Sequence, residues 1–320
     1  LGVNNMATFL TSNAVGERED LSDVIYRIDP DETPVFSNAQ KETTKAVTHD
    51  WQVQELASAA DDNHVNEGAD YSYVNPTATT RLSNVHQIAA QAASVSNTLD
   101  TVDKAGRDRE TAYVKIIKAI EQRRDIEKGL FKNEAKDASD PRKTAKFLSY
   151  MSNVVLESGS SVASGGNGSA AATMSGSNDA LELADIENAM KLAYEDGGQP
   201  DMLVLSPANK VAFSNLSSGS VATNQIQMTA PREAAIIGSV SLFLTDFGTL
   251  NAVIDRNATN TEILLLDSDY YAIGHLPGRM FSVSDVAPTG DATKFAIISE
   301  YVLINRAPKA HAAVFDLNTS

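Results

Sequence analysis

The chain has 320 residues, of which 42% are hydrophobic and 21% charged, and its formal net charge is −16. These values are typical of a folded globular protein with one large domain or two, and they exclude a disordered or fibrous chain. The longest apolar stretches, residues 236–244 and 263–266, are far shorter than the roughly 20 residues of a membrane-spanning helix, so we expect no membrane association.

Two further absences narrow the function. The sequence contains no cysteine, which excludes disulfides, thiolate nucleophiles and cysteine-ligated metal sites. The N-terminus has neither a basic start nor an apolar run of signal-peptide length, so we expect no export by that route.

Thirteen of the 26 Lys and Arg residues lie in residues 100–146, and the rest of the chain is strongly acidic. An acidic surface repels phosphate, which disfavours tight DNA binding.

Residues 1–45 read as an extended arm with few apolar anchors. Turn-forming pairs occur at Asp29-Pro30 and Thr33-Pro34. One short helix is predicted, since its apolar side chains keep helical spacing: Leu21, Val24, Ile25 and Ile28.

A long hairpin is predicted next. In residues 46–56, Val47, Trp51 and Val53 alternate with polar residues, which indicates a strand, and residues 79–95 form a second extended segment. Residues 61–76 between them are polar and turn-rich. A two-stranded hairpin is marginal on its own in water, so we expect this one to lie on a surface, most simply that of a neighbouring subunit.

Residues 98–132 predict a helix of about 50 Å at about 1.5 Å per residue. Most of one face is expected to pack in the core, whereas three charged members of that face, Arg109, Arg124 and Glu127, are candidates for pairing across a subunit boundary. The predicted face consists of Val102, Gly106, Arg109, Tyr113, Ile116, Ile117, Ile120, Arg124, Glu127 and Phe131.

The second half of the chain mixes helices and strands. Residues 158–178 are mostly Ser, Gly and Ala, and we expect a flexible loop there. Helices are predicted at 181–194, ended by Gly197-Gly198, and at 206–216. Strands are predicted at 202–205, 239–244, 252–255, 263–266, 280–283 and 295–304. Because helices and strands follow no regular alternation, the predicted fold class is α+β.

No motif of enzyme chemistry stands out. The five histidines lack metal-site spacing, and neither a nucleophile elbow nor a phosphate-binding P-loop occurs. The turn at residues 166–171 fits a dinucleotide-binding pattern loosely, but no helical periodicity follows it. Residues 255–262 lack the glycine and spacing of a calcium loop. The pairs Asp61-Asp62 and Asp267/Asp269 leave an acidic hydrolase open as an alternative, although chance proximity explains them better. We therefore expect no cofactor, no metal and no catalytic residue.

Short strings spread along nearly the whole chain resemble, in order, a tailed-bacteriophage major capsid family with a Hong Kong 97-like fold. The first strings are residues 16–25 (GEREDLSDVI) and 28–36 (IDPDETPVF), followed by HDW at 49–51, TRLSNVHQI at 80–88 and RDIE at 124–127. The later strings are LSP at 205–207, TDFG at 245–248, TGD at 289–291, SEYVL at 299–303 and AH at 310–311. Each string is weak alone, and their common order makes the resemblance specific.

The resemblance implies an architecture. Residues 1–45 would be the N-terminal arm (N-arm) and 46–97 the extended loop (E-loop). Residues 98–146 would hold the spine helix of the peripheral (P) domain, 147–275 the axial (A) domain, and 276–320 strands that return to the P-domain. Trp51 and Arg81 in the hairpin, together with Arg109, Arg124 and Glu127, would be inter-subunit contacts.

The resemblance also implies a function. Pentamers and hexamers would close an icosahedral shell around double-stranded DNA, without sequence-specific binding, in a virion assembled in the host cytoplasm. A portal protein and decoration proteins would be partners, and scaffolding would be a separate protein or absent. No lysine lies between Lys45 and Lys104, so the hairpin cannot supply the amine of an isopeptide cross-link, and we expect a non-covalent shell. An encapsulin-like nanocompartment, which shares the fold and encloses enzymes, is the alternative.

Overall fold

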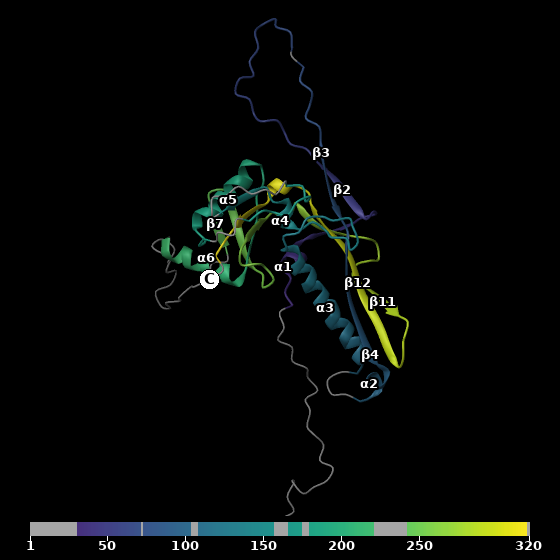
Figure 1. Cartoon of the computed structure of the whole chain (residues 1–320). Helices are drawn as coiled ribbons and strands as arrows, with labels where there is room; N and C mark the ends of the chain where they lie inside the picture. Colours follow the sequence, from purple (N-terminus) through teal and green to yellow (C-terminus); the bar gives the residue numbers. More distant parts are fainter. Residues whose placement is uncertain are drawn as a thin grey trace, which may run out of the picture.

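The computed structural model describes residues 31–71, 73–103, 108–156, 166–174, 179–220 and 242–318. It combines a five-stranded sheet, a six-stranded sheet and a two-stranded ribbon with helices, so the predicted α+β class is confirmed. In Figure 1 the helix α3 (Glu110–Leu130) runs beside the longest strands, and the hairpin loop extends far beyond the body of the subunit. Within the described residues, no helix is both long and apolar enough to cross a membrane.

The five-stranded sheet is organised around one long strand, β12 (Ala292–Asn305). Tyr301 of β12 pairs with Gln87 on one side and with His275 on the other. The strand β4 (Gln87–Ser96) therefore occupies one edge of β12, and β10 (Tyr271–His275) and β11 (Ser282–Val286) share the opposite edge. The strand β1 (Gln40–Thr43) adds to β10 in parallel. Alternating burial along β4 reflects its position with α3 against one face.

The hairpin ribbon pairs β2 (Thr48–Val53) with β3 (Thr80–Val85) in antiparallel register, from Thr48 opposite Val85 to Val53 opposite Thr80. This confirms the extended segments predicted at 46–56 and 79–95. The chain breaks strand pairing at His86, and β4 beyond it belongs to the five-stranded sheet. The hairpin proper therefore ends earlier than the predicted range 46–97.

The six-stranded sheet has the order β5, β13, β9, β6, β8, β7. The buried strands β6 (Met202–Leu205) and β9 (Ile263–Leu266) lie at its centre, as their continuous apolar sequences predict. The strands β8 (Gly248–Ile254) and β7 (Leu242–Thr245) form one end, and β5 (Asn153–Leu156) the other. The helix α5 (Leu183–Glu195) packs on β5 and β13, and α6 (Pro207–Ser220) follows β6; both confirm predicted helices.

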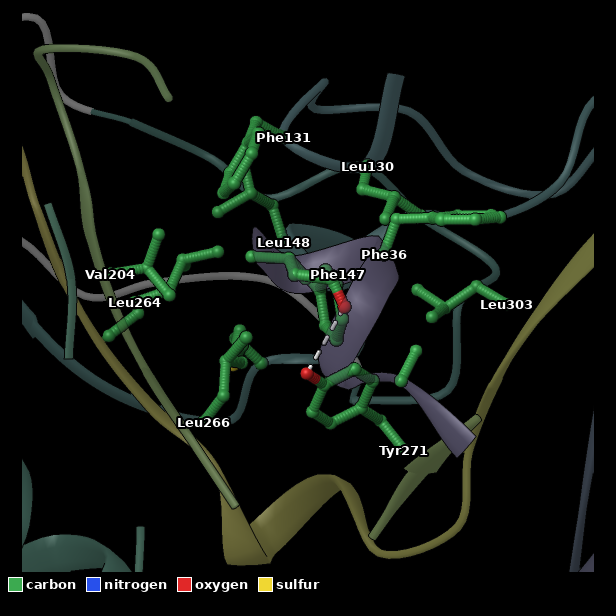
Figure 2. Close-up of a cluster of buried hydrophobic side chains, with 14 of the residues drawn as sticks. Phe36, Leu130, Phe131, Phe147, Leu148, Val204, Leu264, Leu266, Tyr271 and Leu303 are labelled. Atoms are coloured by element: carbon green, nitrogen blue, oxygen red, sulfur yellow. Dashed lines mark hydrogen bonds between the residues drawn. The ribbon is translucent and has the colours of Figure 1, made fainter. Parts of the chain in front are cut away.

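One apolar cluster joins the two large sheets (Figure 2). It collects Phe36 from α1 (Pro34–Asn38), Leu130 from α3 and Phe147 from α4 (Phe147–Tyr150), together with side chains from both sheets. In the same cluster the Tyr271 hydroxyl donates to the Val35 carbonyl oxygen over 3.3 Å. A second cluster fills the space between α5, α6 and the six-stranded sheet. Because the first cluster draws on strands of both large sheets, the two sheets share one core.

The long helix predicted over residues 98–132 is wrong in extent. The structure has α2 (Asn97–Thr101) and then α3, with extended backbone at Val102 and Arg109. The Asp100 carboxylate accepts a hydrogen bond of 3.0 Å from the Thr111 amide, which caps the start of α3 from outside the helix. Gly106 in the intervening sequence also disfavours a continuous helix. At about 1.5 Å per residue, the 21 residues of α3 span about 30 Å rather than about 50 Å.

The predicted face of this helix is also partly wrong. Ile116 is 60% exposed, whereas Gln122, Ile126 and Leu130 are buried. Apart from Glu110, the buried side chains of α3 lie in its second half, where Gln122 donates to the Ala89 carbonyl oxygen of β4 and Ile126 and Leu130 enter the shared core. No single stripe is therefore buried along its whole length.

Two further corrections concern the ends of the chain. The arm does have core contacts, because Val35 and Phe36 of α1 lie in the shared core; the predicted helix at 21–28 lies outside the described residues. The final strand β13 (Ala312–Phe315) inserts between β5 and β9 of the six-stranded sheet rather than returning with β12. Its four buried residues are covered there by neighbouring strands and by the layers on both faces of the sheet.

The sequence patterns did not predict the strands β1, β5, β10 and β13 or the helix α1.

Candidate subunit interface

The hairpin tip exposes apolar side chains to solvent. Residues 54–79, where described, form no regular structure and are exposed throughout. Leu56 is 96% exposed, Tyr73 94% and Val74 87%, and Val65 and Tyr71 are exposed as well. Five large apolar side chains on one protruding loop are costly in water, and such a patch indicates a protein contact surface. The prediction that the tip is polar is wrong at these residues, and the closely spaced Tyr71, Tyr73 and Val74 are the signal in the sequence that indicates an apolar tip.

The root of the hairpin is anchored by Trp51. Its ring packs against Ala272, Val302 and Ile304 of the five-stranded sheet and lies 6.0 Å from the Tyr150 ring, centroid to centroid. The His49 ring stacks on its other side at 5.9 Å. Trp51 is thus half-buried within its own subunit, and the root is fixed while the tip is not.

His86 forms a buried joint where β3 gives way to β4. Its Nε2 lies 2.8 Å from the Thr44 hydroxyl, and its backbone amide donates to the Val47 carbonyl oxygen over 2.8 Å. The side chain is 0% exposed, and burial is the main reason that its pKa is lowered to about 4. His86 is therefore neutral at neutral pH, and its bonds to Thr44 and Val47 hold the two strands together at the root of the ribbon.

Charged pairs line the outside of the ribbon. Arg81 forms a salt bridge with Asp50 on the paired strand, and its side chain is 72% exposed. Beyond the ribbon, Glu55 forms a salt bridge of 3.1 Å with Lys309, next to the last strand. Exposed pairs of this kind add little stability but bias the direction in which the loop leaves the subunit.

Of the predicted contacts, Arg109 directly precedes α3 and is exposed, and Arg124 lies on α3 and is half-exposed. In the part of the chain that the structure describes, neither guanidinium group has a carboxylate partner. The structure does not bring these two residues together with Trp51 or Arg81, which belong to the ribbon at the other end of the subunit.

Glu127 has a different place from the one expected of a surface contact. It is 0% exposed, and its two carboxylate oxygens each accept a hydrogen bond of 2.8 Å, from the Val35 and Phe36 amides at the start of α1. It faces the buried Asp255, and the pKa of Glu127 is raised to about 8 by burial and by that neighbouring carboxyl group. Glu127 therefore holds the arm to α3 inside one subunit, and we do not retain it as an inter-subunit contact.

Among the described residues, no group of three or more His, Asp or Glu side chains has the arrangement of a metal site. The turn at 166–171 packs against Tyr150, and no helix follows it in the described residues up to 174. Lys146 is buried, and its pKa is lowered to about 7, mainly by burial; its ammonium group bonds Gln87 and Tyr301, which are structural partners.

The structure combines a long helix packed on one sheet, a second sheet covered by its own helices, and a protruding hairpin with an apolar tip. This combination defines a shell-forming subunit with the Hong Kong 97-like fold. The model of a family described as SU10 major capsid protein matches residues 3–318. The chain belongs to this family and is a major capsid protein of the tailed-phage type.

Individual relatives agree. The major capsid protein of Escherichia phage Phieco32 is 27% identical over 247 residues, which cover 66% of this chain and 70% of the relative. The capsid asymmetric unit of cyanophage A-1(L) has a similar structure, with 14% identity, a TM-score of 0.65 and coverage of 96% of this chain and 98% of the other. Major capsid proteins of phage G, described together with decoration proteins, match with 11% identity and a TM-score of 0.57 over 97% and 100%. An encapsulin complex from Synechococcus elongatus matches with 12% identity and a TM-score of 0.56 over 95% and 94%.

Proposed function

We propose that copies of this chain form pentamers and hexamers that close an icosahedral shell around double-stranded DNA. The observation that carries the proposal is the hairpin tip, whose exposed Leu56, Tyr73 and Val74 need a protein surface to cover them. A neighbouring copy supplies that surface at every position of a closed shell, because the same contact repeats by symmetry. The exposed Arg81 and Arg109 and the half-exposed Arg124 are proposed as further contacts between copies.

We propose that each observed part of the structure corresponds to one part of a capsid subunit. Residues 1–45 act as the N-arm and the ribbon with its tip as the E-loop. The five-stranded sheet with α3 acts as the P-domain, and the six-stranded sheet acts as the A-domain. The chain has no enzymatic role in this proposal. Its net charge of −16 keeps the wall from binding the genome tightly, since phosphate is repelled. Assembly takes place in the host cytoplasm, with a portal and with separate scaffolding or decoration proteins as partners.

A nanocompartment that encloses enzymes is the second candidate, since an encapsulin has a similar fold. Membership in a major capsid protein family favours the genome container. Particles purified from an infected or expressing host distinguish the two. Protected double-stranded DNA inside nuclease-treated particles supports the capsid, and packaged protein without nucleic acid supports the nanocompartment.

The assembly itself is tested by deleting residues 57–79. Sedimentation and electron microscopy of the unaltered chain should show capsomers or closed shells. The deletion removes exposed residues and almost no core, so circular dichroism and thermal unfolding of the variant should remain close to those of the parent, while stable shells should be lost. Unimpaired shells from the variant would refute the role of the hairpin, and a compact stable monomer from the full chain would refute the proposed assembly.

The shell is proposed to be non-covalent. No lysine stands between Lys45 and Lys104, so the hairpin offers no amine for a cross-link. Denaturing electrophoresis of intact particles should show single subunits, and a ladder of linked subunits would contradict this.

A further inference from the structure

A groove lies between the C-terminal part of α3, the start of α6 and the loop that joins β8 to β9. Its cavity volume is about 1090 Å³. The apolar part of its lining comes from Phe131 and Leu148, which belong to the shared core, and from the more exposed Met174, Pro207 and Ala258. Phe131 and Leu148 are almost fully buried behind the groove, so Met174, Pro207 and Ala258 supply its accessible apolar surface, and an apolar partner on them would extend the shared core.

The rim of the groove carries three cations and two carboxylates. Lys128 lies on α3, Lys132 lies just after its end, and Arg256 lies on the opposite loop, whereas Asp125 and Glu262 also line the groove. Lys132 has a salt bridge of 3.0 Å with Glu134, but within the described residues neither Lys128 nor Arg256 has a carboxylate partner. Glu262 is buried and the Asp125 carboxylate accepts a hydrogen bond from Gln91, so the exposed rim keeps an excess of positive charge on a chain whose net charge is −16. The groove therefore suits an amphipathic segment with acidic flanks.

We propose that the occupant is the chain's own segment of residues 17–29. Its four apolar side chains, Leu21, Val24, Ile25 and Ile28, fall within about 100° of one another at 100° per residue. On the same geometry Asp20 and Asp29 flank that stripe on opposite sides. The segment has five acids against two arginines, so its charge is opposite to that of the rim. Docking places the apolar stripe on the groove floor and the acids against Lys128 and Arg256.

The position of Asp31, the first residue that the structure describes, is compatible with docking of the preceding segment in the groove. Residues Asp31 to Pro34 line a neighbouring hollow together with Arg123 and Ile254. Arg123 precedes Lys128 by five residues of α3, or about 7.5 Å of helix rise. Ile254 is two residues from Arg256. Only Pro30 separates residue 29 from Asp31, so the tether gives the segment a high effective concentration at its own groove.

The absence of cysteine allows a direct test in the full chain. In the pair Ile25→Cys with Ala258→Cys, mild oxidation should form a disulfide within one chain, seen as a monomer band of altered mobility on non-reducing denaturing gels. The matched control pairs Ile25→Cys with Val283→Cys, which lies on the exposed strand β11 away from the groove. The groove pair should exceed the control in yield by about tenfold or more, because of its effective concentration.

A second test reverses the charges on the rim and on the segment. Lys128→Glu with Arg256→Glu should lower the cross-link yield, and adding Asp20→Lys with Asp29→Lys should restore it. Both rim residues are exposed, so folding should be unaffected, as circular dichroism will verify. Yields equal to the control would overturn the proposal. Dimer bands would assign the groove to a neighbouring copy's segment, and acetylation of Lys128 blocked only in DNA-filled particles would assign it to nucleic acid; either result also overturns it.

Discussion

The carboxyl groups of Glu127 and Asp255 face each other in the interior, where the two residues are 0% and 1% exposed. Glu127 comes from α3 and Asp255 from the end of β8, so the pair bridges the two large sheets. Asp255 uses Oδ1 to accept from the Asn257 amide at 2.7 Å, whereas its Oδ2 has no hydrogen-bond partner in the described structure. Two carboxyl groups in contact are stable together only when one of them holds a proton.

We expect Asp255→Asn to flatten the dependence of stability on pH. The pKa of Glu127 is raised from its ordinary value of 4.5 to about 8, so between those values the folded state binds a proton that the unfolded state has lost. Stability should therefore fall as pH rises from about 5 to 8, by on the order of a few kcal/mol. Asn keeps the acceptor for Asn257 and offers an N–H to Glu127, which should lower the pKa of Glu127.

Urea unfolding midpoints of parent and variant, measured from pH 5 to pH 8, check this prediction. The variant should gain on the parent as pH rises. Asp285→Asn, on an exposed strand position, is the matched control and should track the parent. Parallel curves for parent and Asp255→Asn would show that the carboxyl pair carries no shared proton.

We expect acid to loosen the hairpin root through His86. Its pKa is lowered from 6.5 to about 4, chiefly by burial, with Glu300, Arg142 and His49 as charged or titratable neighbours. A lowered histidine pKa contributes stability above about pH 6.5 that is lost as pH falls toward 4. Trp51 is the only tryptophan of the chain and reports locally on whether the root is docked.

His86→Gln should preserve a bond to Thr44 and make the Trp51 emission spectrum less sensitive to pH between 6.5 and 4. His49 also stacks on Trp51, so His49→Gln serves as the control for direct quenching. If His49→Gln, and not His86→Gln, removes the pH response, the joint at His86 is not the acid-sensitive element.

We expect Tyr73→Ser with Val74→Ser to impair assembly without changing the subunit. Both side chains are almost fully exposed, so the subunit should lose little stability. Burying each one in a contact is worth roughly 1.5–3 kcal/mol, so the concentration needed for assembly should rise by more than about tenfold. Light scattering during assembly measures this; Val211→Ser, an exposed apolar position on α6, is the control. Equal thresholds for all three proteins would show that the tip remains uncovered in the shell.

We expect Gly198→Ala to destabilise the subunit. A methyl group there would lie 2.5 Å from the Ala310 Cα, where the chain after α5 passes the turn η2 (Pro308–Ala310). Backbone cannot move aside cheaply, and such overpacking costs about 1–3 kcal/mol. At Gly129 on α3 the nearest atom to an added methyl group is 3.6 Å away, so Gly129→Ala should be neutral or stabilising by about 0.5 kcal/mol. Thermal unfolding of both variants decides, and equal melting temperatures would contradict the close approach.

The sequence by itself determined the α+β class, the hairpin, both helices of the second half and the buried strands at 202–205 and 263–266, because each depends on a local apolar period or a local stop signal. The ordered family strings added the capsid fold. Local signals did not specify the strands β1, β10 and β13, which are held by their neighbours in the sheets.

Only the tertiary structure decided the roles of particular side chains. Glu127 has the same helical spacing as its apolar neighbours, yet α1 and Asp255, about 90 residues before it and 130 after it, give it an internal role. The interruption of strand pairing at His86, and the part of α3 that faces the shared core, likewise depend on which elements pack against these residues. Burial of a charge or a strand is a property of the packed whole, since it is set by atoms distant in sequence.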